Sequence, residues 1–363
     1  MFKTFTTGAL AALMILLLAP GVQAQAGQGK APTESVAELE QKVQEAYQDK
    51  NWVRMYSYSM KLHNQRPFVP EYMLNIVLAS ASLDRPRTAY HYMLKMQQQG
   101  LNYDFAQYPE TEPIRDTEAF EYITDLSVKA GLPSGEGASF MELDVGTMDL
   151  GDVAWDESRG RFLVGTRTNG KLLAVSDNGR SEVLLAADDE NGLWSIDGLE
   201  ADSKNNRLWV ASNASPVFRN FSPADANRGA LFEFDLQTLE LLNRYNLPVD
   251  ALPHELGGIA VTDAGDVYVI DRATAIIFRK DMNSNRLEAF AGSAQLVALT
   301  DIAVTPDNSR IFVADAVMGI LLIDPIAQRS MMLGGPETLN PVSYTHLTLP
   351  TMIIRCRCRG GGG

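Results

Sequence analysis

The second half of the chain repeats one short pattern of strand, turn and strand four times. The first strands of the copies begin around the apolar residues Val153, Leu199, Ile259 and Ile302. Their second strands are the alternating segments 161–164, 207–210, 266–269 and 310–313. The first strands recur at intervals of 46, 60 and 43 residues. A unit this small cannot bury both of its faces alone, so the copies must stack, and the interval is typical of a four-stranded propeller blade.

Further strands are predicted inside each copy. They are expected at 171–175 and 182–185, at 230–235, at 275–279 and 287–290, and at 320–323. An insertion at 214–228 lengthens the second copy. A strand at 140–145 precedes the first copy, and in a propeller such a strand often completes the last blade and closes the ring.

The first 24 residues have the composition of a secretory signal peptide. Lys3 gives a positive start, an apolar run follows from Ala9 to Leu18, and Val22-Gln23-Ala24 is a small-x-small cleavage site. The apolar run is too short for a stable membrane span. We therefore expect cleavage after Ala24, a disordered segment at 25–34, and a periplasmic or secreted protein with no membrane span after cleavage. An uncleaved anchor is the alternative.

The other end of the chain differs from everything before it. Residues 342–351 resemble the translation of a transposon-end sequencing adapter, and an Arg-Cys alternation and four glycines follow. We therefore expect 342–363 to be an artefactual tail, with a natural flexible tail as the alternative. Both cysteines, Cys356 and Cys358, lie in this tail, so neither a disulfide framework nor a cysteine metal site is predicted.

The charge of the chain excludes one class of partner. The formal net charge is −14, and it becomes −18 when Lys3 of the signal and the three arginines of the tail are left out. Basic patches supply most of the affinity of nucleic-acid-binding proteins. We therefore expect no nucleic acid partner.

Residues 35–130 read as a small all-α domain. An apolar stripe at Leu39, Val43 and Ala46 recurs 35 residues later, and prolines and glycines end the segments between. Paired helices at this interval resemble tetratricopeptide repeats, which implies docking of a protein partner. Residues 131–139 have the composition of a linker.

A stripe of tyrosine and methionine side chains runs along the predicted helices. Its members are Met55, Tyr56, Tyr58 and Met60, and then Tyr90, Tyr92, Met93 and Met96. Such a stripe fits either helical core or a peptide-binding groove.

One longer pattern is similar to a known family. It runs Ala-Val-x-x-x-Gly-x-Val-Tyr-Val-x-Asp within 257–271 and is approximated at 301–315. It resembles the senescence-marker-protein/gluconolactonase family of six-bladed β-propellers. The resemblance implies an all-β propeller of the six-bladed type at 140–341, truncated to about four blades.

Characterised members of that family hold a divalent cation at one mouth of the central channel. Carboxylate and amide oxygens from several inner strands suit calcium, which polarises a lactone carbonyl and activates water. Carried over to this chain, the resemblance implies Asp152, Asp197 and Asp301 as ligands, whereas Gly257-Gly258 supplies none at the third copy. The same three aspartates also fit turn chemistry, because aspartate commonly caps the backbone where a strand begins.

His254 and Glu255 lie just before the third inner strand. They could present an imidazole and a carboxylate at the channel mouth as a catalytic acid–base pair. The alternative is an ordinary loop histidine.

Two functions of different classes remain open. The first is an exported binding or scaffolding protein of the gluconolactonase-like superfamily, with a partner at the helical repeats and a small-molecule ligand at the channel mouth. The second is a calcium-dependent lactone hydrolase. The first is favoured because the set of metal ligands is incomplete and because a fold alone is no evidence for an enzymatic activity.

Overall fold

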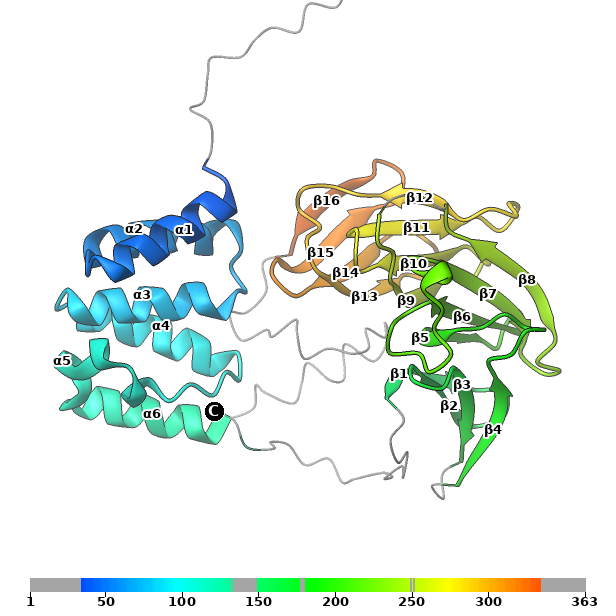
Figure 1. Ribbon diagram of the computed structural model, residues 1–363, viewed down its shortest axis with the longest axis horizontal. Helices are drawn as coiled ribbons and strands as arrows, with labels where there is room; N and C mark the ends of the chain where they lie inside the picture. Colours follow the sequence, from blue (N-terminus) through cyan, green and yellow to red (C-terminus); the bar gives the residue numbers. More distant parts are fainter. Residues whose placement is uncertain are drawn as a thin grey trace, which may run out of the picture. The chain divides into compact units, whose positions relative to one another are not determined.

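The computed structural model describes residues 34–130, 132, 149–176, 180–248, 250 and 252–333 (Figure 1). Helices precede residue 131, and four β-sheets follow residue 149. The predicted signal peptide, the strand at 140–145 and the tail at 342–363 lie outside the described residues. None of the described helices is long and apolar enough to cross a membrane.

The helices expected between residues 35 and 130 are present. They are α1 (Val36–Gln48), α2 (Trp52–Gln65), α3 (Pro70–Ser82), α4 (Pro86–Gln98), α5 (Glu112–Arg115) and α6 (Glu118–Ala130), with short 3₁₀ turns at Phe105–Gln107 and Pro109–Thr111. Asn51 caps α2 by accepting a hydrogen bond from the Arg54 N–H at 3.2 Å. Pro70 and Pro86 are the first residues of α3 and α4. Proline fits this position because a backbone N–H there would have no acceptor within the helix.

The helices bury two apolar clusters. One cluster gathers Leu39, Val43 and Ala46 of α1 with Met55 of α2, and the other lies between α3, α4 and α6. Four of the eight members of the tyrosine–methionine stripe are buried, and the other four are partly buried against the two clusters: Met55, Tyr92, Met93 and Met96, and then Tyr56, Tyr58, Met60 and Tyr90. The stripe is therefore helical core.

The second half of the chain forms four antiparallel sheets, each with its strands in chain order. The first sheet is β1 (Leu150–Asp156), β2 (Arg161–Thr166), β3 (Lys171–Val175) and β4 (Ser181–Ala186). The second is β5 (Ser195–Asp202), β6 (Arg207–Asn213), β7 (Gly229–Asp235) and β8 (Leu241–Asn246). The third is β9 (Leu256–Val261), β10 (Val267–Asp271), β11 (Ile276–Lys280) and β12 (Glu288–Ala291). The fourth is β13 (Leu299–Val304), β14 (Ile311–Asp315), β15 (Gly319–Asp324) and β16 (Arg329–Met332). Four such sheets form a propeller-like β fold.

Two outer strands, β8 and β16, were not predicted. In β8 only Tyr245 is buried, and in β16 no residue is fully buried. Because most side chains of these outer strands are exposed, the sequence there carries little alternation of apolar and polar residues.

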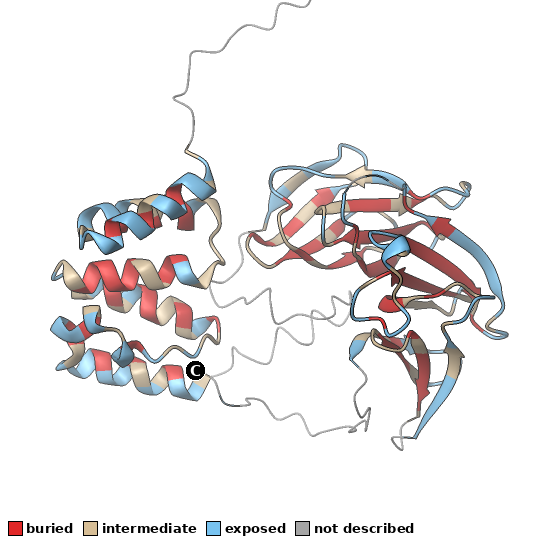
Figure 2. Ribbon diagram, viewed as in Figure 1, coloured by how far each residue is buried: buried red, intermediate tan, exposed pale blue. Residues whose placement is uncertain are grey.

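Successive sheets pack against one another through clusters of buried apolar residues, and Figure 2 shows buried residues in red along the strands. Ala154 and Leu163 of the first sheet meet Leu199 and Phe232 of the second. Equivalent clusters join the second sheet to the third and the third to the fourth. The predicted stacking of the repeats is therefore present among the described residues.

The inner strands β1, β5, β9 and β13 lie close together in this order. A side chain at Gly198 of β5 would overlap with the carbonyl oxygen of Gly257 in β9. Only glycine allows these two backbones to approach so closely. The position next to Asp197 therefore has a structural reason to be glycine.

A buried carboxylate connects three strands of the second sheet. Glu233 of β7 accepts hydrogen bonds from Arg207 Nε, Asn243 Nδ2 and the Tyr245 hydroxyl, each at 2.8 Å. Lys280 of β11 lies 5.8 Å from the centre of the Tyr245 ring. Burial raises the pKa of Glu233, but hydrogen bonds from Tyr245, Asn243 and Arg207 outweigh it and hold that pKa below its ordinary value.

We expect Glu233→Gln to lower the free energy of unfolding at pH 7 by about 2 kcal/mol, because charge-assisted hydrogen bonds are lost. A lowered folded pKa stabilises the protein above the ordinary glutamate pKa of 4.5, and this contribution is lost as the pH falls through the folded pKa. The difference between wild type and variant should therefore persist at pH 5 and shrink in more acidic buffer. Urea unfolding at several pH values measures it.

Glu240→Gln is the matched control, because Glu240 is exposed in the turn between β7 and β8. Its effect should stay within about 0.5 kcal/mol at every pH. An equal effect of the two variants would contradict the role assigned to Glu233.

Candidate functional site

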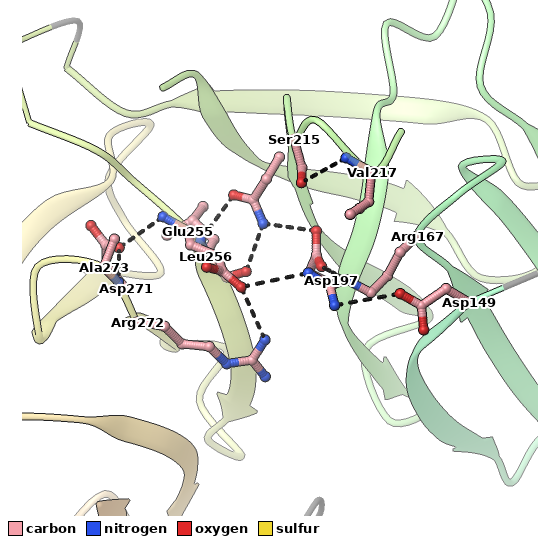
Figure 3. A network of polar contacts seen from close by, with 11 residues as sticks. Asp149, Arg167, Asp197, Ser215, Val217, Glu255, Leu256, Asp271, Arg272 and Ala273 are labelled. Atoms are coloured by element: carbon pink, nitrogen blue, oxygen red, sulfur yellow. Dashed lines mark hydrogen bonds and ion pairs between the residues drawn. The ribbon is translucent and has the colours of Figure 1, made fainter. Parts of the chain in front are cut away.

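Polar side chains from three successive sheets gather where the inner strands begin (Figure 3). We call them the mouth cluster: Asp149, Arg167, Asp197, Asn213, Glu255 and Arg272. They come from the start of β1, the end of β2, the start of β5, the end of β6, the start of β9 and the end of β10. In a stacked array of sheets these strand ends lie at the same edge of the array, which we call its mouth.

The two arginines hold equivalent places in two of the repeats. Arg167 follows the last residue of β2, and its N–H donates to the Asp149 carbonyl oxygen at 2.7 Å. Arg272 follows the last residue of β10, and its N–H donates to the Glu255 carbonyl oxygen at 2.8 Å. In the second sheet, between them, the equivalent residue is Ala214. The repeat therefore points both guanidinium groups toward the mouth, with a small residue between them.

Arg167 is anchored by a buried carboxylate. Its Nε donates to Asp197 Oδ1 at 2.8 Å, and the Asp197 side chain is 1% exposed. Asn213 Nδ2 donates to Asp197 Oδ2 at 3.0 Å and to the Leu256 carbonyl at 2.8 Å, while Asn213 Oδ1 accepts from the Leu256 N–H at 2.8 Å. The buried charge is thus paired and hydrogen-bonded, as burial requires. These contacts join the first three sheets.

Glu255 lies between the two arginines. Its Oε1 is 3.8 Å from Arg167 Nη2 and 4.0 Å from Arg272 Nη1, which is attractive for ion pairs but too long for hydrogen bonds. The side chains of both arginines are about one third exposed. A Cβ on Gly257 would lie 2.6 Å from Cζ and Nε of Arg272, so this guanidinium rests against bare backbone.

The structure gives the predicted metal ligands other partners. Asp152 Oδ1 accepts from the Val153 N–H and its Oδ2 accepts from the Leu199 N–H of the next sheet, both at 2.8 Å. Asp301 is buried, and its Oδ1 accepts from the Ile302 N–H at 2.8 Å. Asp197 pairs with Arg167. The carboxylates of Asp152 and Asp301 thus bind backbone N–H groups, as turn chemistry predicts, whereas the carboxylate of Asp197 binds the side chains of Arg167 and Asn213.

Within the described ranges, no group of three or more histidine, cysteine, aspartate or glutamate side chains is arranged to hold a metal ion. Asp152, Asp197 and Asp301 are therefore not brought together as a ligand set there. The calcium site stays a prediction that rests on the family resemblance.

His254 is engaged on both sides of its ring. Its Nδ1 lies 2.6 Å from Asp271 Oδ2 and its Nε2 lies 3.2 Å from Asp250 Oδ1, and the side chain is buried. Glu255 faces the two arginines instead. The structure therefore gives these two neighbours different partners, and a shared acid–base role for them stays a prediction.

Asp271 has a structural function that the sequence pattern did not suggest. It also accepts hydrogen bonds from the N–H groups of Glu255 and Ala273 and from the Thr274 hydroxyl. Asp315 ends β14 at the equivalent place and accepts from four backbone N–H groups, those of Val297, Ala298, Val317 and Met318. The last aspartate of the quoted family pattern thus ties the loop before the inner strand to the end of the second strand.

Arg167, Asn213 and Arg272 were not identified from the sequence. An alignment of the repeats on the ends of their second strands would have found them, because Thr166-Arg167, Asn213-Ala214, Asp271-Arg272 and Asp315-Ala316 then coincide. The polar residue closes the strand, and the next residue faces the mouth in the first and third repeats.

Comparisons with known proteins give no family for this chain. No family model matches it, and no curated protein matches it. Among solved structures it is similar to a chain in the crystal structure of a nidogen/laminin complex, with 13% sequence identity and a TM-score of 0.41. The match covers 54% of this chain and 67% of the other. A likeness this weak carries no argument about function.

We expect Asp197→Ala to cost about 3 kcal/mol in the free energy of unfolding, since Arg167 and Asn213 lose a buried partner. The cost should be the same in EDTA and in millimolar calcium, as urea unfolding can measure. A wild type that calcium stabilises, beside a variant that calcium does not, would instead support a metal ligand at Asp197.

Asp149→Ala is the control. Asp149 meets the same arginine at 3.5 Å, but its side chain is 53% exposed. Its loss should change stability by less than about 1 kcal/mol, because exposed ion pairs contribute little.

Proposed function

We propose that the chain is an exported binding protein that takes a small-molecule ligand at the mouth cluster. One observation carries the proposal. Two partly exposed guanidinium groups from equivalent positions of different repeats are aimed at one place; a buried ion pair with Asp197 holds Arg167 there, and Arg272 packs against the bare backbone of Gly257. Preorganised polar groups at a channel mouth are typical of ligand sites.

The contacts favour binding over catalysis. Lactone hydrolysis at this mouth would use Asp197 as a metal ligand and His254 as a base. Asp197 pairs with Arg167, and His254 lies between Asp271 and Asp250. No contact among the described residues favours the calcium-dependent hydrolase.

The proposal includes a six-bladed type of propeller, of which the four described sheets are a part. Apolar side chains remain exposed on the two sheets at the ends of the array: Trp155 at 49% and Val183 at 51% on the first sheet, and Met331 at 58% on the fourth. Further sheets that pack on these faces would bury them. The helical repeats would dock a protein partner, and an open cleft of about 530 Å³ beside Tyr47 and Trp52 supports this.

We expect at least one class of small molecule to raise the melting temperature of the full chain. A ligand at a hundred times its Kd stabilises a protein by about 2.7 kcal/mol, which raises the melting temperature by roughly 4 °C for a protein of this size. Arg272→Gln should abolish the shift. Differential scanning fluorimetry with sugars, lactones, amino acids and organic acids measures it.

Arg286→Gln is the charge-matched control, because Arg286 is exposed in the loop between β11 and β12 and lies outside the mouth cluster. It should keep the full shift. A shift that survives Arg272→Gln, or a complete panel without any shift, would contradict the proposal. Calcium-dependent lactone hydrolysis that Asp197→Asn abolishes would favour the other class of function.

A further inference from the structure

The carboxylate of Glu255, a group of the protein itself, lies between Arg167 and Arg272. Its Oε1 is at 3.8 and 4.0 Å from one nitrogen of each guanidinium, and 44% of its side chain is exposed. Both distances are about 1 Å longer than a charge-assisted hydrogen bond between arginine and carboxylate. The carboxylate is thus attracted to the site but not locked into it.

We propose that the ligand of the mouth cluster carries a carboxylate, which binds between Arg167 and Arg272 and displaces Glu255. The inference rests on the proposed function and names its ligand class. Glu255 then acts as an internal competitor that fills the site until the ligand arrives.

The partners of Arg167 define what the site can offer. Its Nε is used by Asp197 and its Nη1 faces Asp149 at 3.5 Å, so Nη2 is the nitrogen directed at Glu255. Arg272 directs Nη1 at the same carboxylate oxygen. A free carboxylate can move to about 2.8 Å from both nitrogens, whereas Glu255 is held by its backbone contact to the Arg272 N–H.

The local charge explains why the Glu255 carboxylate must move away from the two arginines when a ligand carboxylate binds. The mouth cluster contains two arginines and three carboxylates, those of Asp149, Asp197 and Glu255. A fourth carboxylate beside Glu255 would be repelled at this distance. Replacement of Glu255 by the ligand leaves the number of charges in the cluster unchanged.

Gly257 makes the position of Arg272 possible. The guanidinium lies where a Cβ of residue 257 would be, with Cζ and Nε at 2.6 Å and Nη2 at 2.9 Å from that point. Because the end of an arginine side chain can move, alanine at this position should be tolerated. It would shift Arg272 without changing any charge.

Isothermal titration of the full chain with malonate, at constant ionic strength, tests the inference. Glu255→Gln should bind malonate about tenfold more tightly than wild type, because the competitor is removed. Malonamide, a neutral molecule of the same shape, should not bind to either protein. Equal affinity of wild type and Glu255→Gln for malonate, or equal binding of malonamide, would overturn the inference.

Two further variants separate charge from geometry. In the Glu255→Gln background, Arg272→Gln and Gly257→Ala should each weaken malonate binding by about tenfold or more, since one charge-assisted contact is lost. Circular dichroism and unfolding midpoints confirm that each variant folds. Unchanged malonate affinity in folded Gly257→Ala would contradict the assigned position of Arg272.

The failure of the carboxylate inference is distinguishable from failure of the proposed function. A neutral ligand whose thermal shift depends on Arg272, together with no malonate binding to Glu255→Gln, would refute the carboxylate class and leave the binding function standing.

Discussion

The side-chain amide of Asn213 is the interaction on which the mouth of the sheet array depends. Its Nδ2 donates to the Leu256 carbonyl oxygen and its Oδ1 accepts from the Leu256 N–H in the next sheet. The same Nδ2 also donates to the Asp197 carboxylate. Asn213, Leu256 and Asp197 are all buried, so leaving any one of these polar groups without its partner would destabilise the folded protein. Through Asp197 the amide also fixes Arg167 of the sheet before. One side chain thus connects three sheets and places one of the two arginines.

Aspartate carboxylates make similar polar contacts elsewhere in the array of sheets. Asp152 reaches from the first sheet to the Leu199 N–H of the second, and Asp271 and Asp315 hold the loops before their own inner strands. Apolar packing between sheets is non-directional and tolerates small slips. Polar ties of fixed geometry set where each inner strand begins. A ligand site built on such strand ends is already organised before a ligand binds.

The repeat pattern of the sequence predicted the inner and second strands because their buried alternation is strong. It missed β8 and β16, whose exposed residues carry no such alternation. It also singled out Asp152, Asp197 and Asp301, but their partners depend on which backbone groups of other strands come near. Arg167 and Arg272 are 105 positions apart, and only the stacking of three sheets places their side chains at one carboxylate.

Native-state hydrogen exchange of the Leu256 amide tests the role of Asn213 most directly. In wild type we predict that this amide exchanges only through global unfolding, as the amides of the buried central strands do. In Asn213→Ala it should exchange far faster than those amides, whereas the exposed-site control Asn283→Ala should leave it unchanged. Full protection of the Leu256 amide in a folded Asn213→Ala variant would contradict the account.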